Sequence, residues 1–236
     1  MFESRAALPL LLSINAGYVD TAGFLALQGL FTAHVTGNFV TLGASLALGT
    51  SGALAKLLAL PMFCAVVIAV RLLNAVLSNR HWPALELLLA LKVLLLICGA
   101  LLAIRYGPFH DADSWQAVLS GMVLVSAMAI QNAFHRFHLG GAPPSTLMTG
   151  TTTQVMIDLA DRIYAPNRTE SQSGARLVQM STNILFFAIG CGAAAALYSR
   201  FGIMCFVVPP IVGILQLIVL KGSQGRALEP SRRTGS

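Results

Sequence analysis

Residues 57–78 read LLALPMFCAVVIAVRLLNAVLS, a stretch in which Arg71 is the one charged side chain. A helix of this length is roughly 33 Å long, at about 1.5 Å per residue. The hydrocarbon core of a bilayer is about 30 Å thick and needs about 20 apolar residues to cross it. The stretch therefore predicts a membrane-spanning helix, and the rest of the chain is interpreted around it.

The whole chain is apolar for its length. Of its 236 residues, 56% are hydrophobic and 10% are charged, against about 25% charged in an ordinary soluble domain. The first predicted span is interrupted by Asn15, Tyr18 and Asp20, and no small-residue cleavage site follows it, so we expect it to stay in the mature chain. The six predicted spans are residues 8–27, 57–78, 85–104, 115–134, 177–198 and 201–220. We expect Pro209 and Pro210 to kink the last of them.

Basic residues are distributed unevenly over the two sides that six spans define. With the N-terminus in the cytoplasm, 12 of the 15 lysines and arginines fall at cytoplasmic ends and 3 fall outside. Cytoplasmic loops carry such an excess. We therefore expect a multi-pass protein of the bacterial inner (plasma) membrane with both termini cytoplasmic, and no nucleic-acid surface, which would need basic residues clustered on a folded face. The cytoplasmic set is Arg5, Arg71, Arg80, Lys92, Arg136, Arg162, Arg168, Arg176, Lys221, Arg226, Arg232 and Arg233, and the outer set is Lys56, Arg105 and Arg200.

Two further segments are too short to cross the membrane, 36–49 (TGNFVTLGASLALG) and 149–162 (TGTTTQVMIDLADR). Each would form a helix roughly 21 Å long. They match each other at an offset of 113 residues, and a polar stripe on one helical face matches at the same offset. We interpret both as half-helices. The aligned pairs are Thr36 with Thr149, Gly37 with Gly150, Asn38 with Thr151, Thr41 with Gln154, Ser45 with Asp158, Leu46 with Leu159 and Ala47 with Ala160.

Both half-helices follow the first span of their half, so the order span, half-helix, span, span occurs twice. Three spans per half is an odd number, and the second half therefore enters the membrane from the opposite side. The predicted fold is an all-α integral membrane protein with six transmembrane helices and two half-helices, as two inverted-topology repeats of three spans each. The predicted boundaries are a cytoplasmic N-terminus at 1–7, a first repeat at 8–104, an external loop at 105–114, a second repeat at 115–220 and a disordered cytoplasmic tail at 221–236.

The starts of the half-helices are candidate substrate-binding positions. Their other ends have polar flanks that belong in water, so we expect the starts at the protein centre, capped by Thr36 and Thr149. A helix start presents free N–H groups and a positive dipole end, and Gly37 and Gly150 would let a solute approach. The alternative is ordinary caps, packing glycines and interhelical hydrogen bonds. The candidate set is Thr36, Gly37, Asn38, Thr149, Gly150, Thr151, Asn15 and Asn132.

Asp20, in the outer half of the first span, is the candidate coupling residue. An acid inside a span costs about 2.5–3.5 kcal/mol on insertion scales, so it should face a partner or a wet cavity. It would bind a proton or a cation. The alternative is a structural acid that braces the following loop. We expect no metal site, because His135 and His138 have no third ligand nearby at a useful spacing.

Two pairs of motifs resemble the signatures of a known family. NAGYVD (15–20) followed by AHVTGN (33–38) resembles the N-terminal signature of the YoaK family of bacterial membrane proteins. QNA (131–133) followed by MTGT (148–151) is similar to its second signature, and the likeness runs from about Ser13 to Leu220. The resemblance implies a multi-spanning membrane protein. It implies no substrate, because the family is described as a domain of unknown function.

The leading interpretation is a transporter or facilitator of a small polar solute. Two converging helix starts would favour an anionic solute. The alternative is a non-transporting membrane assembly factor or a small membrane enzyme. The chain has no Gly-x-Ser-x-Gly or His-Glu-x-x-His motif, so we expect neither catalysis nor a cofactor. The expected partners are the lipid bilayer, the solute and a second copy of the chain, which would bind through the small-residue faces at Gly190 and Gly192.

Overall fold

The computed structural model describes residues 2–146, 148–164 and 171–228. This part of the chain contains helices and loops and no β-strand, which confirms the all-α prediction. In chain order, with η for a 3-10 helix, the elements are α1 (Phe2–Ala26), η1 (Val35–Gly37), α2 (Asn38–Leu48), α3 (Ala53–Asn79), α4 (Ala84–Tyr106), α5 (Trp115–His138), α6 (Met148–Tyr164), α7 (Ser171–Phe201), η3 (Gly202–Val207) and α8 (Val208–Leu228).

Long apolar helices make this a multi-pass membrane protein. Among the described residues, five segments are long and apolar enough to cross a bilayer: Ala7–Ala26, Ala53–Asn79, Ala84–Tyr106, Trp115–His138 and Gly174–Ser223. The last of these is 50 residues long and contains α7 from Gly174, all of η3, and α8 as far as Ser223.

The last helix differs from the prediction of one span at 201–220 that is kinked by two prolines. Residues 202–207 form η3, and α8 begins at Val208, so Pro209 and Pro210 lie in its first turn. A first turn tolerates proline because its N–H groups have no partner within the helix. The prolines therefore start α8 instead of kinking it. α8 also continues to Leu228, into the predicted tail, while residues 229–236 and the predicted cytoplasmic charge Arg168 lie outside the described residues.

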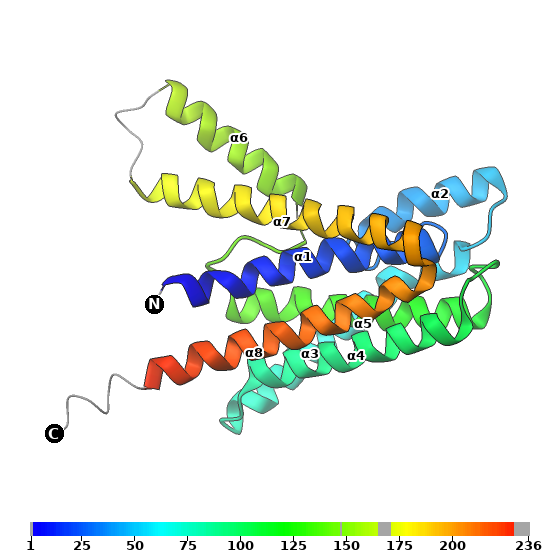
Figure 1. Ribbon diagram of the computed structural model, residues 1–236, viewed down its shortest axis with the longest axis horizontal. Helices are drawn as coiled ribbons and strands as arrows, with labels where there is room; N and C mark the ends of the chain where they lie inside the picture. The colour runs from blue at the N-terminus through cyan, green and yellow to red at the C-terminus, as the bar shows by residue number, and fades with distance from the viewer. Residues whose placement is uncertain (1, 147, 165–170, 229–236) are drawn as a thin grey trace.

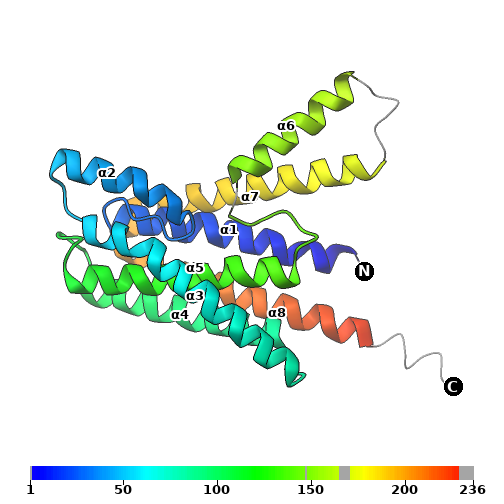
Figure 2. The ribbon, with the colours of Figure 1, turned by 180° about the vertical axis from the view of Figure 1, so that it is seen from behind.

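The long helices lie side by side in a bundle, and α1 begins at the end of the molecule where α8 finishes (Figure 1). α1 and α5 run in opposite directions. After α1 the chain turns back before α2 leaves towards one end, and after α5 it turns back before α6 leaves towards the other end (Figures 1 and 2). The two short helices therefore start near the middle of the bundle and point away from each other.

α1 packs along α7 through two glycines. A Cβ atom at Gly190 would lie 2.1 Å from the carbonyl oxygen of Ile14, and one at Gly17 would lie 2.2 Å from that of Phe187. Carbon and oxygen atoms in close non-bonded contact are about 3.3–3.6 Å apart. Both positions therefore need glycine for the two backbones to touch, as small residues do in membrane helix pairs. Gly190 therefore packs against α1 of the same chain, whereas no described atom lies within 4 Å of a Cβ atom at Gly192.

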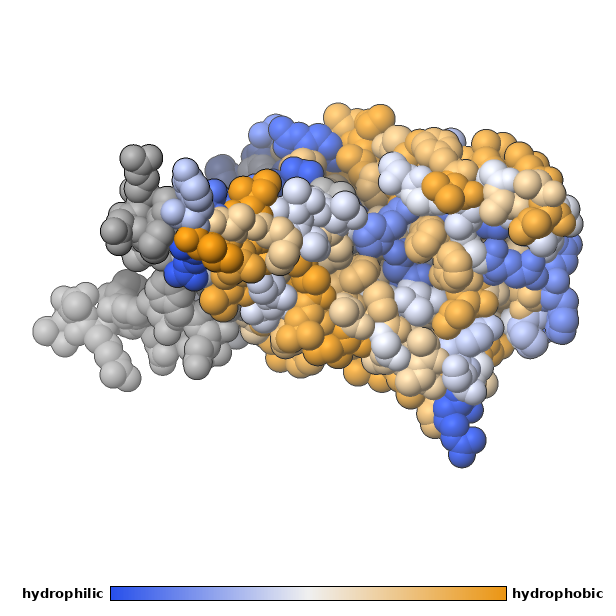
Figure 3. All heavy atoms as spheres, turned by 90° about the horizontal axis from the view of Figure 1, so that it is seen from above, coloured by the Kyte–Doolittle hydropathy of each residue, from blue (hydrophilic) through white to orange (hydrophobic). Residues whose placement is uncertain are grey.

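Apolar side chains cover much of the face of the molecule seen in Figure 3. Val40 and Leu48 on α2 are each 76% exposed, and Ile163 on α6 is 77% exposed. An apolar surface of this extent is unfavourable in water but matches lipid acyl chains. The outside of the bundle is therefore suited to contact with the bilayer.

Candidate functional site

Asp20 is buried near the end of α1 and accepts hydrogen bonds from the loop that follows. Its Oδ1 accepts the backbone N–H groups of Thr32 and Ala33, each at 2.7 Å, and the Thr32 hydroxyl at 3.3 Å. Its Oδ2 lies 2.6 Å from Nδ1 of His34. The carboxylate therefore holds the loop that leads to η1 and α2, and His34 supplies the partner that a buried acid needs.

The His34 ring connects Asp20 with two other parts of the bundle. The hydrogen bond to Asp20 raises the pKa of His34 above its usual range, burial lowers it, and the Asp20 charge and the Thr146 backbone carbonyl raise it further. The centroid of the imidazole ring lies 5.3 Å from that of Phe187 on α7 and 6.5 Å from that of Phe31. His34 thus lies where α1, α7 and the segment before α6 come together.

A cavity of about 470 Å³ lies beside the Asp20–His34 pair. This volume falls in the range of about 300–1,000 Å³ that is typical of small-molecule sites. Two of its walls are the Phe24 and Phe31 rings, whose centroids are 4.9 Å apart. The described lining residues are Asp20, Thr21, Phe24, Phe31, His34, Gly37, Phe187 and Cys191, of which Asp20, His34 and Cys191 are titratable.

The start of α2 borders this cavity, but Thr36 does not cap it as predicted. η1 precedes α2, Gly37 is the N-cap residue, and no side chain caps the helix. Thr36 is exposed. Asn38 is buried and binds Phe31 twice, its Oδ1 accepting the backbone N–H and its Nδ2 donating to the carbonyl, both at 2.8 Å. Gly37 lines the cavity, and Asn38 fixes the position of one aromatic wall.

The start of α6 also differs from the prediction. Thr149 is the second residue of α6 and not its N-cap, and both Thr149 and Gly150 are exposed. No described atom lies within 4 Å of a Cβ atom at Gly150, so none of the described residues approaches this glycine closely. The reason is that α6 packs on α7 through one face, which buries Thr151 and Val155 and leaves the opposite face open.

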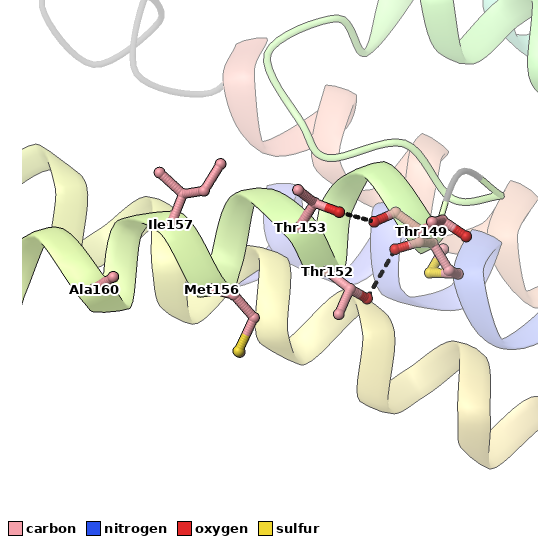
Figure 4. A pocket seen from close by; sticks show the side chains of 7 residues that line it. Thr149, Thr152, Thr153, Met156, Ile157 and Ala160 are labelled. Carbon is pink, nitrogen blue, oxygen red and sulfur yellow. Dashed lines mark hydrogen bonds between the residues drawn. The ribbon is translucent and has the colours of Figure 1, made fainter.

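A shallow groove of about 670 Å³ follows the open face of α6 (Figure 4). The hydroxyls of Thr152 and Thr153 donate to the backbone carbonyls of Met148 and Thr149, at 2.9 and 3.0 Å. The hydroxyl groups of both threonines therefore donate within the helix. The threonine methyl groups and the Met156 side chain form most of the groove wall. The groove has the character of a lipid-facing or helix-facing surface.

The second half contains loop braces like the one at Asp20. Polar side chains near the end of α5 bind the loop that leads to α6, just as Asp20 binds the loop that leads to α2. Asp20 and His34 are 14 residues apart, and the same spacing separates Gln131 from Ser145 and Asn132 from Thr146. The Oδ1 of Asn132 accepts the Thr146 hydroxyl at 2.5 Å, and the Nε2 of Gln131 donates to the Ser145 hydroxyl at 3.0 Å.

Asp158 connects α6 to α7. Its carboxylate pairs with Arg176 at 2.9 Å and accepts a hydrogen bond from Gln154 at 2.7 Å. The pair is bidentate, since both carboxylate oxygens of Asp158 accept hydrogen bonds from the Arg176 guanidinium group. Hydrogen bonds from Arg176 and then from Gln154 lower the pKa of Asp158 below its usual range.

Two other polar residues lie inside the bundle and are not among the described lining residues of the cavity. Asn15 is fully buried. Lys92 is also fully buried, so it does not extend to the cytoplasmic interface as its place among the cytoplasmic charges assumed. Its side chain points between helices, because α8 supplies a hydrogen-bond acceptor there.

Comparison with known proteins shows which family the chain belongs to. A family model described as "Protein of unknown function (DUF1275)" matches residues 8–219. The chain belongs to the DUF1275 family. It is 33% identical over 167 residues to the UPF0700 transmembrane protein YoaK of Bacillus subtilis (strain 168). The aligned region covers 68% of this chain and 69% of that protein. The resemblance inferred from the motifs is confirmed, and no solved structure matches the chain.

In this DUF1275 protein, His34 is the candidate residue that sequence analysis did not single out. It belongs to the AHVTGN motif and lies 14 residues after Asp20. That motif was a usable signal, but spacing alone does not reveal that the chain turns back on α1. Among the described residues, no group of three or more His, Cys, Asp or Glu side chains is placed to hold a metal ion.

Proposed function

We propose that this protein is a transporter or facilitator of a small polar solute in the bacterial inner membrane. The observation that carries the proposal is the cavity of about 470 Å³ beside the Asp20–His34 pair. Ionisable side chains within apolar spans commonly mark ion and solute pathways. The cavity also has aromatic walls, so the solute that suits it combines a hydrogen-bonding group with a small apolar part. A small organic acid meets both requirements.

The proposal includes six crossings arranged as two inverted repeats. α7 and α8 would be separate spans within the 50-residue apolar segment. The opposite directions of α1 and α5, the divergence of α2 and α6, and the matching 14-residue braces support this arrangement. In such repeats the substrate site lies near the midplane, where interrupted helices meet. The positive-inside distribution supports cytoplasmic termini.

Within this proposal, Asp20 and His34 carry the coupling together. Four donors already surround the Asp20 carboxylate. The His34 ring is 31% exposed, so it is the member of the pair that can exchange a proton with the cavity. Asp20 would hold the ring in place and stabilise its charged form.

The test is uptake into proteoliposomes of a panel of small organic acids and amino acids, with and without a pH gradient. Wild-type protein should take up at least one solute, and the gradient should change the rate. Asp20→Asn and His34→Gln should abolish the effect of the gradient. Asp161→Asn, which changes an exposed acid on α6, should retain it. Uptake no faster than in empty liposomes for every solute would contradict transport.

A second candidate is a non-transporting assembly factor. One observation favours it, since the contacts of Asp20 are those of a brace and the open face of α6 offers a surface for a partner helix. In that case Asp20→Asn would lower the melting temperature, and no solute would enter the liposomes. Neither proposal includes catalysis.

A further inference from the structure

Lys92 is a buried lysine without a counter-charge among the described residues. It lies on α4, its side chain is fully buried, and its Nζ donates to the Oε1 of Gln216 on α8 at 2.8 Å. No carboxylate in the described part of the chain forms an ion pair with it. A lysine ammonium has three donors, and Gln216 is an uncharged amide that supplies an acceptor for one of them.

The same hydrogen-bond chain leads to Asn15. The Nε2 of Gln216 donates to the carbonyl of Leu11 at 2.8 Å. In an α-helix this carbonyl also accepts the backbone N–H four residues later, which belongs to Asn15. The Gln216 amide therefore lies beside the backbone N–H of Asn15. The Asn15 side chain is 0% exposed, and neither its Nδ2 nor its Oδ1 has a hydrogen-bond partner among the described residues.

A second glutamine completes this polar layer. The Nε2 of Gln131 on α5 donates to the carbonyl of Leu12 at 2.9 Å, next to the carbonyl that Gln216 binds. The Oε1 of Gln131 is buried and has no partner in the described part of the chain. Gln216, which binds Lys92, and Gln131 thus reach neighbouring backbone carbonyls in the turn of α1 that leads to Asn15.

Such a layer is unfavourable without a further component. Buried polar atoms in native proteins are nearly always paired, and a buried lysine stays charged only where a counter-charge or strong hydrogen bonds stabilise its ammonium group. A cation would be repelled by Lys92. Water would satisfy amide atoms but would not neutralise the ammonium. A small anion does both, because it pairs with Lys92 and accepts hydrogen bonds from amide N–H groups.

We propose that a small monovalent anion of about the size of chloride or formate binds between Lys92 and Asn15, within this layer. The site is separate from the cavity at Asp20 and His34. Its existence does not depend on transport, and the anion either stabilises the bundle or passes through it.

The test is the melting temperature of the purified protein in detergent with chloride, bromide or formate, compared with gluconate at the same ionic strength. Wild-type protein should melt at a higher temperature in the small anions, with saturation as their concentration rises. Lys92→Met should fold, because methionine is apolar and of similar length, and should lose the anion dependence. Asn15→Leu should raise the half-saturating concentration about tenfold or more, because it removes a hydrogen bond to a charged ligand.

Lys221→Met is the matched control, since it removes an exposed lysine at the end of the bundle. It should keep the full anion dependence of the wild type. Equal melting temperatures in chloride and gluconate for wild-type protein would overturn the proposal. So would an undiminished chloride effect in Lys92→Met, because the anion would then act elsewhere on the protein.

Discussion

Replacing Gly190 with alanine tests the close packing of α1 on α7. The new Cβ atom would lie 2.1 Å from the carbonyl oxygen of Ile14 and 3.0 Å from the backbone nitrogen of Tyr18. Both neighbours are backbone atoms, so neither can rotate away as a side chain would. To reach an ordinary carbon–oxygen separation, the two helices must move apart by about 1 Å or more. That movement loosens every other contact between them.

The expected cost follows from overpacking in close-packed interiors, which is about 1–3 kcal/mol. A rigid backbone neighbour places Gly190→Ala at the upper end, at about 3 kcal/mol. Since about 1 kcal/mol corresponds to 2–4 °C in a chain of this size, the melting temperature should fall by roughly 6–12 °C.

Gly192→Ala is the matched control, two residues further along the same helix. In the described part of the chain, no atom lies within 4 Å of a Cβ atom at Gly192. Alanine is about 1 kcal/mol more favourable than glycine inside a helix, so this variant should melt at or above the wild-type temperature. The measurement is thermal unfolding of both variants in the same detergent, pH and salt. If the two variants melt together, the close contact at Gly190 is not what stabilises α1 against α7.

Three further predictions concern charge and orientation. Because Asp20 raises the pKa of His34, the stabilisation from this pair is complete below about pH 6.5 and is lost as pH rises through the raised pKa. The melting temperature of the wild type should therefore fall relative to that of His34→Gln from pH 6.5 upward. Parallel curves of melting temperature against pH for the two proteins would contradict this. Because Arg176 lowers the pKa of Asp158, the Asp158–Arg176 pair contributes about 1 kcal/mol of stability above about pH 4 and loses it below that pH. Asp158→Asn should therefore reduce the fall in melting temperature at acid pH, whereas Asp161→Asn should not. Reporter fusions at 79–84 and after 221 should be cytoplasmic and those at 106–114 external, and a periplasmic C-terminus would refute six spans in this orientation.

The long helices could be predicted from the sequence because bilayer thickness fixes how many apolar residues a helix needs. Residues 57–78 fall inside α3, which extends by four residues before this stretch and by one residue after it. The boundary between α7 and α8 was harder to place, since residues 202–207 are as apolar as their neighbours. The prolines at 209 and 210 were visible, but sequence did not distinguish the start of a helix from a kink within one.

The site was less predictable because it depends on how loops fold back. Asp20 was identified from the cost of an acid in a span, and Gly37 from its place in the repeat. His34 became a candidate only once the loop after α1 was seen to return to Asp20. For Lys92 the sequence favoured a route to the interface, because a long side chain can reach water from that depth. The acceptor that keeps it inside lies 124 residues away on α8.

The way α6 is attached has a consequence for how the protein responds to its surroundings. Among the described helices, α6 packs substantially only against α7, and a single bidentate pair reinforces that contact. Where no partner helix covers the open face of α6, acyl chains of the bilayer would fill the space along it (Figure 4). Lipid order and thickness then set the angle between α6 and α7, because a helix with one protein neighbour tilts at small cost to match the hydrocarbon around it. The same chain should hold α6 differently in thin and thick bilayers, so the membrane itself becomes a determinant of conformation.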